Sequence, residues 1–212
     1  MTSNTLRQPE QRIQLSGISW QTYQVLLREL SDRRLHLTYN RGILEIMAPS
    51  PEHELYKKLL GRFVETIAEE LKISIYPVGS TTLNRPDISG GLEPDDCFYI
   101  QNRTAVKGKK RIDLTHDPPP DLAIEIDLTS SAKNRLEVLA HIGVPEVWRY
   151  DGVSLTIYQL QNKKYTPCHQ SRTFGRFPID KVDLFLLKAG MVDYLDLVNS
   201  FRRWVKSQNR QQ

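Results

Sequence analysis

Apolar residues recur along the chain at two spacings, which predict alternating helices and strands. Helical spacing, every three or four residues, dominates residues 20–30, 55–71 and 194–205. Ser19 and Ser50 precede the first two of these stretches and are suited to cap a helix, and Pro51 is suited to a first helical position. The pattern therefore predicts an N-terminal helix, a long second helix and a C-terminal helix.

Between these helices, apolar and polar residues alternate as they do in strands. The segments 35–39 and 43–47 alternate on either side of Asn40-Arg41-Gly42, which predicts a hairpin. The segments 121–127 and 145–150 also read as strands, with a helical stretch between them. A strand–helix–strand order needs a crossover and predicts a parallel pair. The fold class is therefore expected to be α/β (α+β mixed), with a mixed β-sheet flanked by helices.

Composition narrows the class of protein. A chain of 212 residues can bury a substantial core, and one domain over 1–212 is expected, with a loose N-terminus at 1–10, a core at 11–178 and a C-terminal helical extension at 179–212. The net charge of +4 favours polyanionic partners only weakly. Two distant cysteines without a CxxC motif speak against a zinc ribbon and suit a reducing compartment. With no apolar run of membrane-spanning length and no signal-peptide layout, the expected location is the cytoplasm and no membrane partner is expected.

Two acidic stretches carry the candidate chemistry. Asp95 follows Pro94 just before an apolar strand, and Glu125 and Asp127 end the strand at 121–127. Side chains alternate along a strand, so Glu125 and Asp127 should share a face, where they repel one another unless a cation neutralises them. If Asp95 meets them, the three carboxylates form a site for Mg²⁺ or Mn²⁺, which suits phosphodiester hydrolysis. Without metal, the substitution Asp127→Asn should then stabilise the fold.

Other signatures of catalysis are missing from the sequence. It contains no GxGxxG, GxxxxGK[ST], GxSxG or HExxH motif, and its five histidines are scattered. At helical spacing Glu52 and His53 face inwards and Glu54 faces solvent. A structural hydrogen bond is favoured for His53, and for Glu52 a helix-dipole interaction is an equal alternative to a functional role.

A basic loop offers a second candidate feature. The loop contains Lys107, Lys109, Lys110 and Arg111 around Gly108. Contact with nucleic-acid phosphates and simple solvation are both open for this loop, solvation being the commoner outcome.

The order of these motifs resembles a known superfamily. Pro94-Asp95, then Glu125 near the end of an apolar strand, then a cationic helix residue is similar to the PD-(D/E)XK nucleases. A closer resemblance, over about residues 17–160, is to the Uma-two family of restriction-endonuclease-like proteins. It is carried by Ser50-Pro51-Glu52-His53, Pro120-Asp121-Leu122, Glu125-Ile126-Asp127 through Ser130-Ser131, and Gly143-Val144-Pro145-Glu146-Val147-Trp148.

The resemblance implies a restriction-endonuclease-like fold over the core and a metal-dependent endonuclease that cleaves nucleic acid, DNA being the expected form. Asp95 and Glu125 would hold Mg²⁺, with Asp127 as a third ligand or a proton acceptor. Arg135 would supply the cation usually provided by lysine; arginine can stabilise developing charge but cannot act as a general base. Lys133 is an alternative donor and a candidate nucleic-acid contact, and Glu52 is similar to a helix glutamate placed beside the metal.

Two further possibilities stay open at this point. A chain with arginine in place of the lysine is also compatible with a catalytically inactive nucleic-acid-binding descendant of the same fold, or with a protein-interaction module. A homodimer is compatible with double-strand cleavage, which needs two sites, and with the apolar face of the C-terminal helix.

Overall fold

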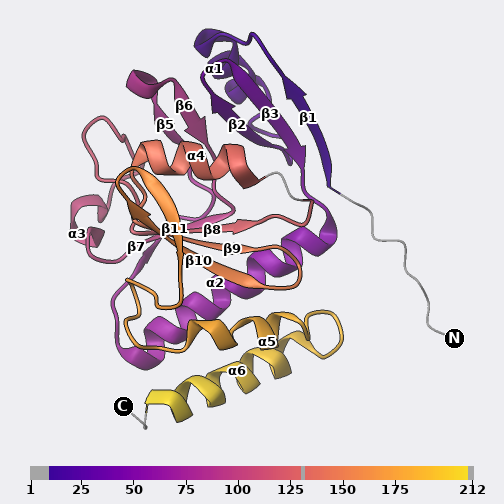
Figure 1. The fold of residues 1–212 in the computed structure, drawn as a ribbon, viewed down its shortest axis with the longest axis vertical. Coiled ribbons are helices and arrows are strands. Elements are labelled where there is room, and N and C mark those ends of the chain that lie inside the picture. The colour runs from indigo at the N-terminus through magenta and orange to yellow at the C-terminus, as the bar shows by residue number, and fades with distance from the viewer. Residues whose placement is uncertain (1–9, 130–131, 210–212) are drawn as a thin grey trace, which may run out of the picture.

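A computed structural model describes residues 10–129 and 132–209, which form two β-sheets and the helices that cover them (Figure 1). The first sheet is antiparallel throughout and has the strand order β1-β3-β2-β6-β5. Its strands are β1 (Gln11–Leu15), β2 (His36–Asn40), β3 (Ile43–Ala48), β5 (Leu83–Arg85) and β6 (Gly90–Leu92).

The second sheet is mixed and has the strand order β11-β10-β9-β8-β7-β4. Its strands are β4 (Tyr76–Pro77), β7 (Asp96–Tyr99), β8 (Leu122–Ile126), β9 (Glu146–Tyr150), β10 (Leu155–Gln161) and β11 (Lys164–Cys168). Strands β8 and β9 run parallel, and the other neighbours in this sheet run antiparallel. The predicted α/β class with a mixed sheet flanked by helices is confirmed.

Helices cover both faces of the second sheet. The helices are α1 (Trp20–Glu29), α2 (Pro51–Leu71), α3 (Arg103–Val106), α4 (Ala132–Ile142), α5 (Asp183–Leu186) and α6 (Tyr194–Asn209). Figure 1 shows α2, α5 and α6 on one side of this sheet and α4 on the other. Helix α6 packs on α2, where the rings of Phe201 and Phe63 stack at a centroid distance of 4.0 Å. The apolar face of the C-terminal helix is therefore buried within the chain.

Alternation along the strands decides which side each carboxylate faces. Leu122, Ile124 and Ile126 of β8 belong to the apolar cluster under α2, whereas Ala123 belongs to the cluster under α4. Glu125 follows the alternation of Ala123 and so takes the α4 side. Cys97, which pairs with Ala123, also belongs to the α4 cluster, so Asp95, two residues earlier, takes the same side as Glu125.

Most of the predicted local signals are confirmed. The Ser19 hydroxyl accepts a hydrogen bond from Thr22 N at 3.0 Å, and Ser50 accepts one from His53 N at 3.1 Å, so both cap their helices. The hairpin turn falls at Arg41 and Gly42, whose φ values of 47° and 92° suit a two-residue hairpin turn. Helix α4 provides the predicted crossover between the parallel strands β8 and β9.

The pattern missed several short elements. Strands β1, β5 and β6 were not predicted, and the one-turn helix α3 lies in a segment expected to be a loop. Strands of three residues are too short to show a period, and β6 begins with two glycines. Within the segment expected to be loose, residues 1–9 lie outside the described residues, whereas Glu10 is buried. Over the described part of the chain, no helix is both long and apolar enough to cross a membrane.

Gly91 in β6 is required by close packing against α1. A Cβ atom at Gly91 would lie 2.2 Å from Asn84 Oδ1 and 2.8 Å from Tyr23 Oη, which are themselves joined by a hydrogen bond of 2.9 Å. We therefore expect Gly91→Ala to lower the free energy of unfolding by about 1–3 kcal/mol, measured by urea denaturation. Gly90→Ala in the same strand is the control, because its Cβ would meet only side-chain carbons, of Ile88 at 3.3 Å and Val138 at 3.7 Å. Equal stability of the two variants would contradict this account.

Candidate active site

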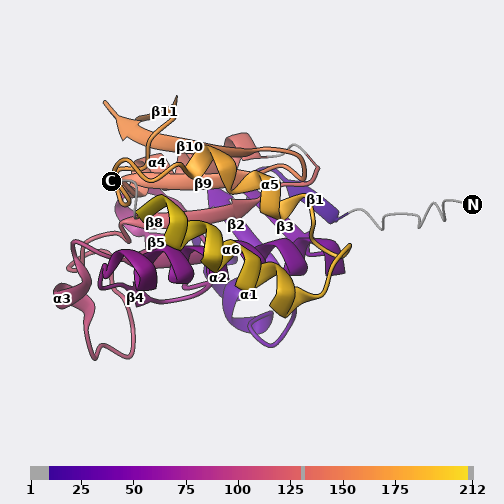
Figure 2. The same ribbon diagram turned by 90° about the horizontal axis from the view of Figure 1, so that it is seen from below.

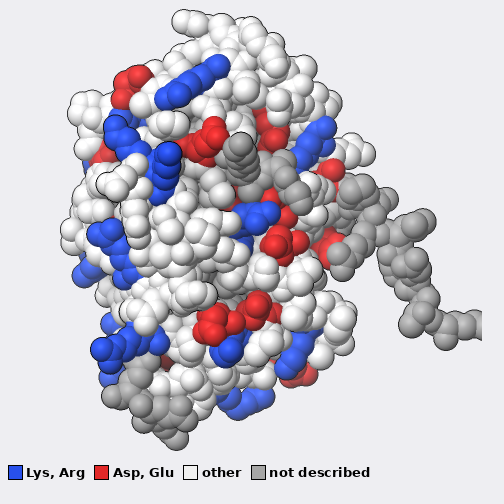
Figure 3. Space-filling model, viewed as in Figure 1, with Lys and Arg blue, Asp and Glu red and all other residues white. Residues whose placement is uncertain are grey.

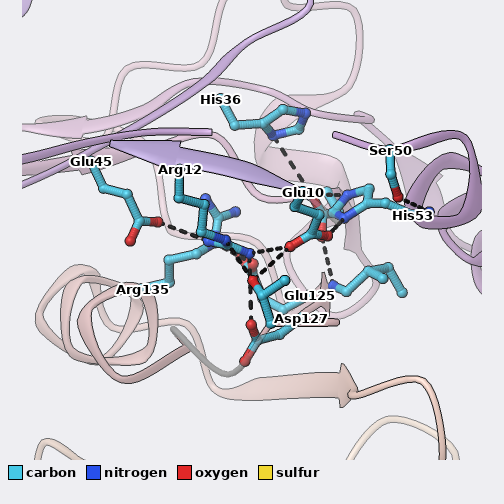
Figure 4. Close-up of polar contacts among 12 residues, drawn as sticks. Glu10, Arg12, His36, Glu45, Ser50, His53, Glu125, Asp127 and Arg135 are labelled. Carbon is cyan, nitrogen blue, oxygen red and sulfur yellow. Dashed lines mark hydrogen bonds and ion pairs between the residues drawn. The ribbon is translucent and has the colours of Figure 1, made fainter. Parts of the chain in front are cut away.

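A cluster of ionisable side chains is buried where the two sheets meet (Figure 4). We call it the buried charge cluster, and its members come from strands of both sheets, from the segments that adjoin them, and from helices α2 and α4. It consists of Glu10, Arg12, His36, Glu45, His53, Asp95, Glu125, Asp127, Arg135 and Arg149. All of these residues except Arg12 and Arg149 are 8% exposed or less. Burying this many charges requires that they neutralise one another.

Asp95 is fully buried at the start of β7. Its Oδ2 accepts a hydrogen bond of 2.6 Å from the main-chain N–H of Ile126. Its Oδ1 lies 3.1 Å from His53 Nε2 and 3.6 Å from His36 Nδ1, but it has no hydrogen bond of acceptable geometry within the described residues. Burial alone would raise the pKa of Asp95, but the neighbouring His53 and Arg135 hold it well below its usual range. Asp95 is therefore ionised at neutral pH.

Glu125 lies on the adjacent strand and is neutralised from α4. Its Oε2 accepts a hydrogen bond of 2.5 Å from Arg135 Nε. Arg135 also donates to Thr38 Oγ1 at 2.9 Å and to the main-chain oxygen of Glu93 at 2.8 Å, which fixes the plane of its guanidinium. Glu125 Oε1 has no hydrogen-bond partner within the described residues. Burial raises the pKa of Glu125, Arg135 offsets this in part, and the charge of Asp95 raises it further.

His53 lies between two carboxylates. Its Nδ1 is 2.5 Å from Glu10 Oε1, on the side opposite Asp95. Burial alone would lower the pKa of His53, but the contacts with Asp95 and Glu10 raise it to about 9. His36 behaves in the opposite way, because burial lowers its pKa to about 4. At neutral pH the cluster therefore contains one charged and one neutral histidine, and the predicted structural hydrogen bond of His53 is confirmed.

Asp127 is held by two arginines from different sheets. Arg149 of β9 donates to Asp127 Oδ2 at 2.7 Å and 3.1 Å, and Arg12 of β1 lies 3.6 Å from Asp127 Oδ1. Arg12 also donates to Glu10 at 2.7 Å and to Glu45 at 2.9 Å (Figure 4). These contacts link the strand β1, which carries Arg12, to the end of β8 and to β9.

The predicted site residues thus divide into two groups. Asp95, Glu125 and Arg135 come together, whereas Asp127 belongs to the arginine-rich side of the cluster. Among the described residues, no group of three or more His, Cys, Asp or Glu side chains is arranged to hold a metal ion. The expected convergence of three carboxylates on one ion is therefore not seen. Of the three, Asp95 and Glu125 are the two that lie together.

The remaining predicted residues lie elsewhere. Glu52 is half-buried in the first turn of α2 and accepts a hydrogen bond of 3.5 Å from Tyr56 Oη. Four basic residues are exposed in and beside the loop that follows α3, namely Lys107, Lys109, Lys110 and Arg111, of which Lys109 pairs with Asp117. The side chain of Lys133 lies outside the described residues.

Sequence reasoning missed five members of the buried charge cluster: Glu10, Arg12, His36, Glu45 and Arg149. The alternation of polar and apolar residues at 11–15 could have identified β1 and, with it, Arg12. Glu10 was assigned to a loose terminus, although it contacts His53, 43 positions further along the chain. No local signal distinguishes His36 or Arg149 from other strand residues.

Two acidic residues of the matching motifs have structural roles. Asp121 accepts hydrogen bonds from the main-chain N–H groups of Ile100 and Asn102 at 2.6 and 3.0 Å. Glu146 is fully buried and accepts from Trp148 Nε1 at 2.7 Å and from Ser171 Oγ at 2.6 Å. Both carboxylates order nearby loops, so a motif acid need not belong to the active site.

Comparison with known proteins shows which family this chain matches. A family model described as "Uma2: Putative restriction endonuclease" matches residues 20–179. Among solved structures, the chain is similar to "a putative nuclease belonging to DUF820" from Anabaena variabilis ATCC 29413, with 14% identity and a TM-score of 0.48. That match covers 78% of this chain and 90% of the other. No curated protein sequence matches this chain significantly.

The position of His53 predicts a pH dependence of folding in the metal-free protein. The pKa of His53 rises from 6.5 to about 9 on folding. A raised histidine pKa stabilises the fold fully below pH 6.5, and this stabilisation is lost as the pH rises through about 9. At about 1.4 kcal/mol per pKa unit, the wild type should lose roughly 3 kcal/mol relative to His53→Gln across this window. Urea denaturation in EDTA measures this difference.

The exposed His116 provides the control for this measurement, because its side chain is 82% exposed. The substitution His116→Gln should leave the pH profile of the wild type unchanged. Parallel profiles for the wild type and His53→Gln would show that His53 is not held in its charged form.

The arginine contacts of Asp127 reverse the expectation for its substitution. Asp127→Asn removes a buried charge that two arginines share, so we expect the free energy of unfolding to fall by about 2 kcal/mol or more, measured by urea denaturation in EDTA. Asp87→Asn is a matched control, because Asp87 also forms a two-bond pair with an arginine, Arg85, but is largely exposed. Exposed pairs contribute little, so the loss there should be smaller. If the Asp127→Asn variant were more stable than the wild type, repulsion among Asp95, Glu125 and Asp127 would outweigh the arginine contacts of Asp127.

Proposed function

The chain belongs to the family described as "Uma2: Putative restriction endonuclease", and from this premise we propose that it is a metal-dependent endonuclease that hydrolyses phosphodiester bonds in nucleic acid. The family model covers most of the chain, including every member of the buried charge cluster except Glu10 and Arg12. Membership makes a nuclease the leading hypothesis, and the geometry of the cluster supports a specific site for the reaction.

One observation carries the proposal: two buried carboxylate oxygens lie on the same side of adjacent strands without a hydrogen-bond partner in the described residues. They are Asp95 Oδ1 and Glu125 Oε1. A buried carboxylate oxygen that accepts no hydrogen bond is costly, and Asp95 Oδ1 accepts none although it lies 3.1 Å from His53 Nε2. Carboxylate oxygens are the ligands that Mg²⁺ and Mn²⁺ prefer. We therefore assign a divalent cation, Mg²⁺ or Mn²⁺, to these two residues.

A divalent cation bound there would polarise the scissile phosphate and lower the pKa of the attacking water. The chain's own residues prepare the site for it. The main-chain N–H of Ile126 fixes Asp95 so that Oδ1 is the oxygen left available. Arg135 orients Glu125 in the same way and leaves Oε1 available.

Arg135 contributes through its charge alone. All three nitrogens of its guanidinium donate hydrogen bonds, to Glu125, Thr38 and Glu93, so its position is fixed before substrate arrives. A fixed cation can stabilise the negative charge that develops on a transferring phosphate, but it cannot accept a proton from water. Asp127 is engaged by Arg12 and Arg149 and is assigned to supporting the site rather than to holding the metal.

A second function has its own supporting observation. Arg135 lies 2.5 Å from Glu125 and already neutralises one of the two carboxylates without any metal. The same arrangement is what a catalytically inactive nucleic-acid-binding descendant of the fold would retain. The two functions differ in whether Asp95 and Glu125 bind a metal ion.

The nuclease proposal predicts that metal binding and cleavage are lost together. The wild type should bind Mn²⁺ in isothermal titration calorimetry and nick plasmid DNA with Mg²⁺ or Mn²⁺. Asp95→Asn and Glu125→Gln should each reduce cleavage by about a hundredfold or more and abolish measurable Mn²⁺ binding. Both substitutions preserve shape, and circular dichroism checks that the variants fold.

Glu65→Gln is the matched control, because Glu65 is a half-exposed carboxylate of α2 that forms an ion pair with Arg62, three residues earlier in the same helix. This variant should bind Mn²⁺ and cleave like the wild type. A folded wild type that binds no Mn²⁺, or a Glu125→Gln variant that cleaves normally, would reject the nuclease proposal in favour of the inactive descendant.

A further inference from the structure

A cavity of about 750 Å³ opens beside the buried charge cluster. It reaches the cluster at His36 and at Glu93, whose main-chain oxygen binds Arg135. Basic side chains on its wall are Arg33, Arg34 and Lys57. The N-cap of the 21-residue helix α2 also lines it, and a helix N-terminus attracts anions.

A second cavity has a volume of about 790 Å³. One wall is the α1 helix and the other is the loop that follows α3, both of which project to the same side of the molecule in Figure 2. The loop contributes Lys109, Lys110 and Arg111, the basic residues for which phosphate contact was left open. Tyr76 of β4 lines the same cavity and is only partly buried.

The two cavities have no lining residue in common among those described, but consecutive residues of the segment Ser80–Thr82 line them. Ser80 lines the first cavity, and Thr81 and Thr82 line the second. Ser80 Oγ donates to the main-chain oxygen of Asp95 at 3.0 Å, and Thr82 Oγ1 donates to Glu93 Oε1 at 2.7 Å. The floor between the cavities is thus tied directly to a candidate metal ligand.

The charge of the combined lining is basic. Six lysines and arginines face three carboxylates, which are Glu54, Glu93 and Asp113. The face shown in Figure 3 differs, because basic and acidic side chains are interspersed over it. His36 connects this lining to the buried charge cluster, because its Nδ1 lies 3.6 Å from Asp95 Oδ1.

We propose that the two cavities form one groove that binds a single strand of nucleic acid, which runs from the loop after α3, across Ser80–Thr82, to the α2 N-terminus. This inference rests on the proposed function for the identity of its ligand. Basic side chains contact the phosphates, and Tyr76 provides a stacking surface for a base. The strand then passes Asp95 at the point where the cavity reaches His36.

Binding without cleavage tests the groove. Fluorescence anisotropy of a labelled single-stranded DNA oligonucleotide, in EDTA and over a range of salt concentrations, uses the full chain and needs no active metal site. Arg33→Ala/Arg34→Ala and Lys110→Ala/Arg111→Ala should each weaken binding about tenfold. Each pair should also reduce the slope of log K against log salt by about 1.4, the value for two lost phosphate contacts on a single strand.

Arg203→Ala/Lys206→Ala is the matched control. It removes the same charge from exposed residues of α6, at the other end of the molecule from α1 (Figure 1). This variant should keep the slope of the wild type. Tyr76→Ala should weaken single-strand binding while leaving the slope unchanged, because stacking releases no counterions.

Several outcomes would overturn the groove. The groove would be rejected by an unchanged salt slope in both groove variants, or by an equal loss of affinity in the α6 control. It would also be rejected if the protein bound duplex DNA more tightly than the single strand and Tyr76→Ala did not change this binding. If binding behaves as predicted while the wild type cleaves nothing with Mn²⁺, the groove is supported and only the nuclease chemistry fails. The same oligonucleotide sequence as RNA distinguishes the two kinds of strand.

Discussion

The mutual neutralisation of buried charges at the junction of the two sheets is the interaction on which the rest of this structure depends. Five carboxylates, Glu10, Glu45, Asp95, Glu125 and Asp127, are almost completely removed from water. They are offset by three arginines and by the charged His53. Because removal of one partner from such a cluster leaves an uncompensated charge, its members hold the two sheets together as a unit.

The same constraint explains why the site is assembled from distant segments. Arg12 comes from β1, His53 from α2, Arg135 from α4 and Arg149 from β9, so each cation arrives on a different element. No single hairpin or helix brings all four of these cations to the carboxylates. The charge cluster and the packing of the first sheet against the second therefore form together.

Neutralisation within the cluster is nevertheless incomplete at two atoms. Asp95 and Glu125 each use one oxygen in a short hydrogen bond, and the other oxygen accepts no hydrogen bond within the described residues, although Asp95 Oδ1 lies 3.1 Å from His53 Nε2. The rigid contacts on the first oxygen determine where the second one lies. The proposed metal site rests on this fixed pair, and one of the basic cavities reaches the cluster beside it at His36 and Glu93.

The sequence by itself determined the elements whose signals are local. Helices α1, α2 and α6, the hairpin at Arg41-Gly42 and the β8–α4–β9 crossover follow from periodicity, caps and turn residues. It also indicated Asp95, Glu125 and Arg135 as candidate site residues, from the acidic strand ends and from the resemblance to a known family, and these three come together. Only the tertiary structure decided that Asp127 is held by arginines, that Glu10 and Arg12 belong to the site, and which histidine is charged. These properties depend on burial and on partners up to 119 positions away, as in the contact between Thr129 and Glu10, and neither is encoded in local spacing.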